Sequence, residues 1–233
     1  MLFLFHSSVI ALNLFAIWYD QQYVDIPFLD ETFVKMPFKG RCLFLTVWCL
    51  VLQTIYFTIS LINDLIGTNV TAPKKPPLIR KIKDMVFSLA FTAAIYVAAT
   101  FWGLYITNKE LIFPDECELI VPSWLNHALH TLIVPFMLIE LKFTKRNYPS
   151  RILSITLALT FCAVYVIVIH AIYYRTGSWV YPFLNMFSWP MKVMFNGCSA
   201  IVVALICILG EKLDGLTNMN LRVMFKNISV KSH

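Results

Sequence analysis

Six apolar runs, each close to the length of a transmembrane helix, limit what this chain can fold into more than any other feature. A helix needs about 20 mostly apolar residues to cross the hydrocarbon core of a bilayer. The runs cover about residues 2–19, 42–65, 85–106, 124–141, 152–174 and 186–209. Charged residues make up only 14% of the chain, whereas soluble domains carry about 25%. The sequence therefore predicts an all-α, polytopic membrane protein, with residues 1–233 forming a single integral-membrane domain of six spans.

Lysine and arginine are distributed unevenly among the loops between these runs. They are frequent in 66–84, in 142–151 and in the tail after 209, and rarer in the other loops. Loops rich in these residues stay in the cytoplasm, so we expect both termini to be cytoplasmic, as an even number of spans requires. The net charge of +6 then reflects orientation, and we expect no nucleic acid partner. The plasma membrane and the endoplasmic reticulum are both compatible with the sequence.

The fourth run opens with WLNHALHT at 124–131, which places two histidines in a membrane segment. Ionisable side chains are costly in a bilayer and therefore indicate function. His127 and His130 are three residues apart, so they can share a helix face, a spacing that also suits a metal or a haem. A metal would need a carboxylate at the same depth, and a haem would need an axial histidine from a facing helix, either His6 or His170. We expect neither a metal nor a cofactor.

A stripe of polar residues follows the second run. Four of them lie within about 40° of one another on a helix with about 100° per residue: Thr46, Gln53, Ser60 and Asp64. Such a stripe should face the interior of the bundle, where Gln53 and Ser60 are most simply explained as hydrogen-bonding partners of other helices. A lone threonine in a membrane helix usually bonds to a carbonyl one turn earlier, so the stripe alone does not make Thr46 a nucleophile.

Depth in the membrane favours a pairing of Thr46 with His130. Both runs enter from the extracytoplasmic side, and with about 1.5 Å of rise per residue the two residues lie roughly 7–11 Å below that interface. A hydroxyl beside an imidazole forms a nucleophile–base pair. Asn126, one turn before His130, is placed to orient the imidazole or to donate to an oxyanion. Glu140 and Asp64 lie near the far ends of their runs, so we expect a dyad without a buried acid.

The last run carries Lys192, Asn196 and Ser199 at spacings of four and three residues. Two interpretations of Lys192 are open. Its ammonium group either extends to the interface, or it attracts a fatty carboxylate or an acidic side chain. The segment from Asp20 to Gly40 mixes aromatic and acidic residues and is a candidate cover for the site.

Several short motifs, in order along the chain, together make a specific resemblance. They are FLTVWCLVLQ (44–53), WLNHALHT (124–131), PFMLIE (135–140), YPS (148–150), TGSWVYPF (176–183) and LGEKL (209–213). With these motifs, residues 41–213 resemble the androgen-induced protein 1 / androgen-dependent TFPI-regulating protein family.

This resemblance implies a multi-span hydrolase with a threonine nucleophile that cleaves fatty acid esters of hydroxy fatty acids. The family's threonine, at the start of the second span, corresponds to Thr46, and its histidine, the second one of NHxxHT, corresponds to His130. His127 matches the motif without being its catalyst, and no motif assigns a role to Lys192. We therefore predict a Thr46–His130 dyad acting on a lipid from the bilayer. The predicted supporting or substrate-binding residues are Asn126, His127, Gln53 and Lys192.

Two other classes of function fit the sequence. One is a non-enzymatic membrane scaffold that binds lipid or regulates other membrane proteins. The other is a transporter, which would need polar residues across the full bilayer on several helices. The runs at 85–106 and 152–174 carry few such residues, which disfavours a transporter. The sequence leaves open the preferred acyl chain, the oligomeric state and any protein partners.

Overall fold

A computed structural model describes the backbone of residues 1–25, 31–69 and 75–231, and the side chains of these residues except 31–32 and 218–231. All regular structure in these ranges is helical, as predicted. The helices are α1 (Leu2–Tyr23), α2 (Glu31–Val34), the 3-10 helix η1 (Pro37–Leu43), α3 (Leu45–Ile66), α4 (Leu78–Asn108), η2 (Lys109–Leu111), α5 (Asp115–Ile120), α6 (Ser123–His130), α7 (Ile133–Phe143), α8 (Arg151–Thr176), α9 (Pro182–Met186) and α10 (Trp189–Lys231).

Five of the six predicted spans are continuous helices, namely α1, α3, α4, α8 and α10, each long and apolar enough to cross a membrane. The fourth is different, because the run at 124–141 is divided into α6 and α7, which meet at a bend of 45°. The expectation of one continuous helix there is wrong. Pro135 causes the bend, because in a regular helix its ring would clash with the carbonyl of Thr131, four residues earlier. Counted as one broken span, α6 and α7 make the sixth crossing, and the chain is an integral membrane protein.

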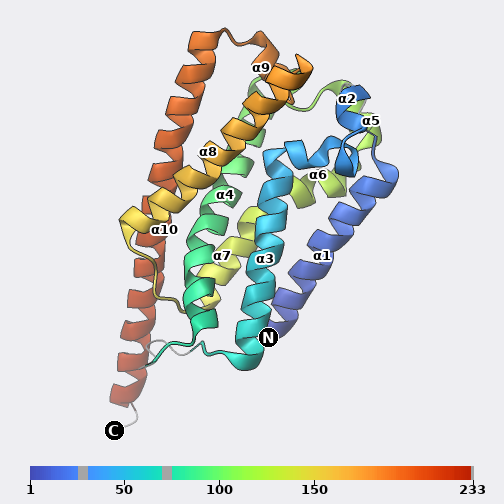
Figure 1. The fold of residues 1–233 in the computed structure, drawn as a ribbon. Helices are drawn as coiled ribbons and strands as arrows, with labels where there is room; N and C mark the ends of the chain where they lie inside the picture. The colour runs from blue at the N-terminus through green and yellow to red at the C-terminus, as the bar shows by residue number, and fades with distance from the viewer. Residues whose placement is uncertain (26–30, 70–74, 232–233) are drawn as a thin grey trace.

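The helices surround α4, which contacts α3, α7, α8 and α10. Its side chains explain this central place, because Ala90 and Ala94 are fully buried and small residues allow helix backbones to approach closely. The chain termini lie at the same end of the bundle (Figure 1), as an even number of crossings requires. We call this end the terminal face and the other end the opposite face. The cytoplasmic location of the terminal face stays a prediction.

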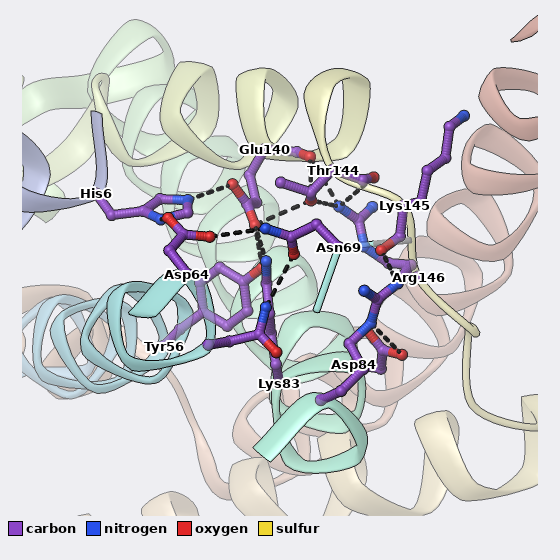
Figure 2. A network of polar contacts seen from close by, with 12 residues as sticks. His6, Tyr56, Asp64, Asn69, Lys83, Asp84, Glu140, Thr144, Lys145 and Arg146 are labelled. Atoms are coloured by element: carbon purple, nitrogen blue, oxygen red, sulfur yellow. Dashed lines mark hydrogen bonds and ion pairs between the residues drawn. The ribbon is translucent and has the colours of Figure 1, made fainter. Parts of the chain in front are cut away.

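A buried ionic network ties four helices together near the terminal face, as Figure 2 shows. His6 of α1 lies between two carboxylates, with Nδ1 2.7 Å from Asp64 and Nε2 2.9 Å from Glu140. Glu140 also accepts a hydrogen bond of 2.7 Å from Tyr56 and lies 3.1 Å from the Lys83 ammonium. Asp64 and Glu140 thus both belong to this network, where they compensate buried charges. Neither acid lies beside His130.

Candidate active site

The opposite face brings Thr46 and His130 together. Thr46 is the second residue of α3, and His130 is the last residue of α6. The Thr46 Oγ1 lies 3.2 Å from Nε2 of His130, within reach of a proton transfer. The break after His130 contributes to this geometry, because α6 turns away from the axis of α7 and contacts α3.

Asn126 orients the His130 ring from the side opposite Thr46. Its side-chain Oδ1 lies 2.7 Å from Nδ1 of His130, and its backbone oxygen lies 3.2 Å from the same atom. Among the described residues only oxygens contact Nδ1, so Nδ1 carries the ring proton of the neutral imidazole. It donates a hydrogen bond to Asn126. The lone pair of Nε2 then points at the Thr46 hydroxyl. The arrangement is therefore a Thr–His–Asn chain, in which Asn126 takes the first of the two roles that the sequence left open, the orientation of the imidazole.

Phe101 of α4 fixes the plane of the imidazole. Its ring lies parallel to that of His130, at 5° and with 3.5 Å between ring centroids, and His130 is only 8% exposed. Sequence reasoning missed this residue, because an aromatic near the end of an apolar run also fits the interfacial belt of membrane proteins. A helical contact to a histidine 29 positions later has no signal in a single sequence.

His127 and Gln53 lie away from the Thr46 hydroxyl. His127 is exposed and bonds to Thr131 Oγ1 at 3.0 Å, while its ring stacks on Trp102. Gln53 donates a hydrogen bond of 2.7 Å to the Ile133 carbonyl and so joins α3 to α7. The described residues include no group of three or more His, Cys, Asp or Glu side chains arranged to hold a metal.

The first turn of α3 provides a free backbone donor beside the Thr46 hydroxyl. The first four N–H groups of a helix have no intrahelical acceptor. Leu45 N–H donates to the hydroxyls of Tyr165 and Tyr181 at 3.1 and 3.0 Å. The N–H groups of Val47 and Trp48 donate to the Phe44 carbonyl. Within the described ranges, the Thr46 N–H has no acceptor of its own.

Two cavities meet at Thr46. The larger, of about 420 Å³, lies among α4, α8 and α10, and we call it the α8–α10 cavity. The smaller, of about 260 Å³, lies among α1, α3 and α6, and we call it the α1–α6 cavity. Asn126 and His130 line the smaller one. Four residues line both: Thr46, Phe101, Ile112 and Tyr181. Thr46 therefore lies at the junction of two cavities with mainly apolar walls.

The polar residues of the last span face the α8–α10 cavity. Lys192, Asn196 and Ser199 of α10 all line it. The Lys192 ammonium donates to the Phe187 carbonyl and lies 5.1 and 5.3 Å from the ring centres of Trp179 and Trp189.

Residues of the expected cover line the α1–α6 cavity, among them Asp20 and Phe38. Positions 26–30 of that segment lie outside the described residues. Cys117 of α5 also lines this cavity. Burial raises the pKa of its thiol to about 11, so Cys117 stays protonated near neutral pH.

Comparison with known proteins gives a consistent result over most of the chain. Androgen-induced gene 1 protein of Homo sapiens is 32% identical over 192 residues, which cover 78% of this chain and 81% of that protein. Androgen-dependent TFPI-regulating protein of Mus musculus is 35% identical over 176 residues, covering 75% and 76%. The corresponding protein of Homo sapiens is 32% identical over 201 residues, covering 84% and 87%.

No solved structure matches this chain. A family model described as FAR-17a/AIG1-like protein matches residues 1–215. The resemblance that the short motifs indicated thus extends over nearly the whole chain. The protein belongs to the FAR-17a/AIG1-like family.

Proposed function

We propose that this protein is a membrane-embedded ester hydrolase that cleaves fatty acid esters of hydroxy fatty acids, with Thr46 as the nucleophile. One observation carries the proposal. The Thr46 hydroxyl lies 3.2 Å from His130 Nε2, at the point where two mainly apolar cavities meet. An ester that joins two fatty chains places its reactive carbonyl between two apolar arms, and the junction suits that shape.

The reaction follows from the proton on the Thr46 hydroxyl. Nε2 of His130 takes this proton as Oγ1 forms a bond to the ester carbonyl carbon. The tetrahedral intermediate then collapses as the bond from that carbon to the alkoxy oxygen breaks, and His130 returns the proton to the departing hydroxy fatty acid. Water, deprotonated by the same nitrogen, attacks the acyl carbon. The bond between the acyl carbon and Oγ1 then breaks and releases the fatty acid, and His130 returns its proton to Oγ1, which restores the threonine.

Two donors at the junction suit the negative charge that develops on the carbonyl oxygen. One is the Thr46 N–H at the positive end of the α3 dipole. The other is the Tyr181 hydroxyl, which accepts hydrogen bonds from Leu45 N–H and from Tyr165 at 3.0 and 2.9 Å. The single Tyr165 proton has two acceptors at 2.9 Å, the Tyr181 hydroxyl and the Leu43 carbonyl. When it goes to Tyr181, the Tyr181 proton is available to the oxyanion. The side-chain oxygen of Asn126 is engaged with His130, so only its Nδ2 amide group could donate to the oxyanion.

The depth of the site fits a substrate that partitions into the bilayer. Thr46 lies in the first turn of the membrane helix α3, and the walls around it are mainly apolar. Such a site receives its ester laterally from the membrane, in the plasma membrane or the endoplasmic reticulum. The competing proposal is a lipid-binding scaffold, which would use the same cavities without any chemistry at Thr46.

The deciding experiment compares wild type, Thr46→Ala and His130→Ala in membranes. Each is treated with a fluorophosphonate probe and, separately, with a hydroxy fatty acid ester. We expect probe labelling and ester turnover in wild type, and a loss of at least about 10³-fold in both variants.

Thr54→Ala provides a matched control. Thr54 lies on the same helix and lines neither cavity, and its hydroxyl bonds to the Leu50 carbonyl at 2.8 Å. It should react like wild type. Equal labelling and turnover in all four proteins would exclude the Thr46–His130 pair as the catalyst. Labelling and turnover no higher than in membranes without the protein would exclude the hydrolase and leave the scaffold.

A further inference from the structure

Lys192 carries a buried positive charge that has no anionic partner among the residues that the structure describes. Its side chain is only 7% exposed. Among the described residues no carboxylate forms an ion pair with it, and no aspartate or glutamate lines the α8–α10 cavity. One carbonyl and two indole faces compensate an ammonium charge only in part. A buried cation in an apolar chamber of this kind is completed by an anionic group of a ligand.

The α1–α6 cavity also contains a cation, but that charge is already neutralised. Arg41 Nε lies 2.6 Å from the Asp20 carboxylate, and both residues line this cavity. Although Nη1 of Arg41 has no acceptor in the described structure, a second carboxylate would meet the repulsion of Asp20. Counted over the described cavity linings, net positive charge therefore lies on the Lys192 side of Thr46.

We propose that Lys192 binds the free carboxylate of the substrate and so assigns the two arms of the ester to the two cavities. The arm that bears the carboxylate, which is the departing hydroxy acid, lies in the α8–α10 cavity. The acyl chain that is transferred to Thr46 lies in the α1–α6 cavity, beside Leu50 and Val51. This inference rests on the proposed hydrolase function and adds substrate recognition to it. The enzyme then prefers esters with a carboxylate on the alcohol portion over neutral esters of the same size.

The test compares two substrates that differ in one group. The first is a hydroxy fatty acid ester. The second is the matched ester of a secondary fatty alcohol, which has a methyl group in place of the carboxylate. The ratio of their kcat/KM values is measured for wild type, Lys192→Met, Lys192→Arg and Arg41→Gln in detergent micelles. A general loss of fold or of catalysis lowers both rates and leaves this ratio unchanged.

We expect wild type to have the higher kcat/KM for the carboxylate substrate. In Lys192→Met the ratio of the two kcat/KM values should fall about tenfold or more, which is the contribution of a charge-assisted hydrogen bond. Lys192→Arg keeps the charge and should retain the preference, as should Arg41→Gln. An unchanged ratio in Lys192→Met would overturn the proposal, as would a ratio that falls only in Arg41→Gln. Equal rates for both esters in wild type would overturn it too while leaving the hydrolase in place. Turnover of neither ester would instead contradict the hydrolase itself.

Discussion

The side-chain oxygen of Asn126 lies 2.7 Å from Nδ1 of His130, one helical turn later on α6. This contact fixes the imidazole so that its other nitrogen faces Thr46. A histidine base in a hydrolase needs such a partner, because the wrong tautomer offers a proton where a lone pair is required. In this membrane site the partner is a neutral amide. It orients the ring without adding a second buried charge, which would be costly in the bilayer.

Replacing Asn126 by leucine removes this orienting oxygen. We expect kcat for a hydroxy fatty acid ester to fall about tenfold to a hundredfold with little change in KM. The loss stays well below that of Thr46→Ala, because the backbone oxygen of Asn126 remains 3.2 Å from Nδ1. Asn126→Asp keeps an acceptor in place and should retain more activity than the leucine variant. Equal kcat values for Asn126→Leu and wild type would refute the orienting role.

Tyr181→Phe removes one of the two donors that we assign to the oxyanion. We expect kcat to fall about tenfold to a hundredfold, somewhat less than the largest effects of oxyanion donors, because the Thr46 N–H remains. Tyr165→Phe is the matched control. Its hydroxyl lies 2.9 Å from the Leu43 carbonyl and has no assigned contact with the ester, so kcat should change less. A larger loss in Tyr165→Phe than in Tyr181→Phe would reverse the assignment.

Glu140→Ala should destabilise the fold through the network of Figure 2. Glu140 is fully buried beside His6 and Lys83, and removing it leaves Lys83 without its counter-charge. Loss of one partner of a buried pair costs about 3–5 kcal/mol, so the Tm in detergent should fall clearly. Arg151→Gln breaks a pair of 2.7 Å with Glu211 that is half exposed. It should leave the Tm nearly unchanged, and similar Tm values for the two variants would contradict the network's role.

Two glycines of α10 differ in what a methyl group would meet. A Cβ at Gly210 would lie 2.6 Å from the Tyr148 hydroxyl and 3.0 Å from Phe91, so Gly210→Ala forces α10 away from α4. We expect a cost of about 1–3 kcal/mol, as for other overpacked sites. A Cβ at Gly197 would meet nothing within 4 Å, and Gly197→Ala should hold or raise the Tm, because alanine favours a helix. Thermal melts of both variants test the packing of α10.

The polar pattern of the sequence predicted part of the candidate site. Thr46 and His130 were paired from their depth below one interface, and the structure brings those two side chains together. The pattern did not reveal Phe101, Tyr181 or the free Thr46 N–H. Each depends on a helix end or a helix–helix contact, and periodicity within one span contains no information about its neighbours. The break after His130 was also missed, although Pro135 was visible, because the composition of 124–141 is that of a full span.

The sequence by itself determined that this chain is an integral membrane protein of helices. The reason is that a bilayer forces long apolar segments to satisfy their backbone hydrogen bonds internally. The sequence also showed where polar side chains enter the membrane at an energetic cost, including Thr46 and His130. Only the tertiary structure decided what those residues face. Helix packing placed Asn126 behind the imidazole and opened two cavities at Thr46. It also placed the Lys192 ammonium in one of them, without an anionic partner among the described residues.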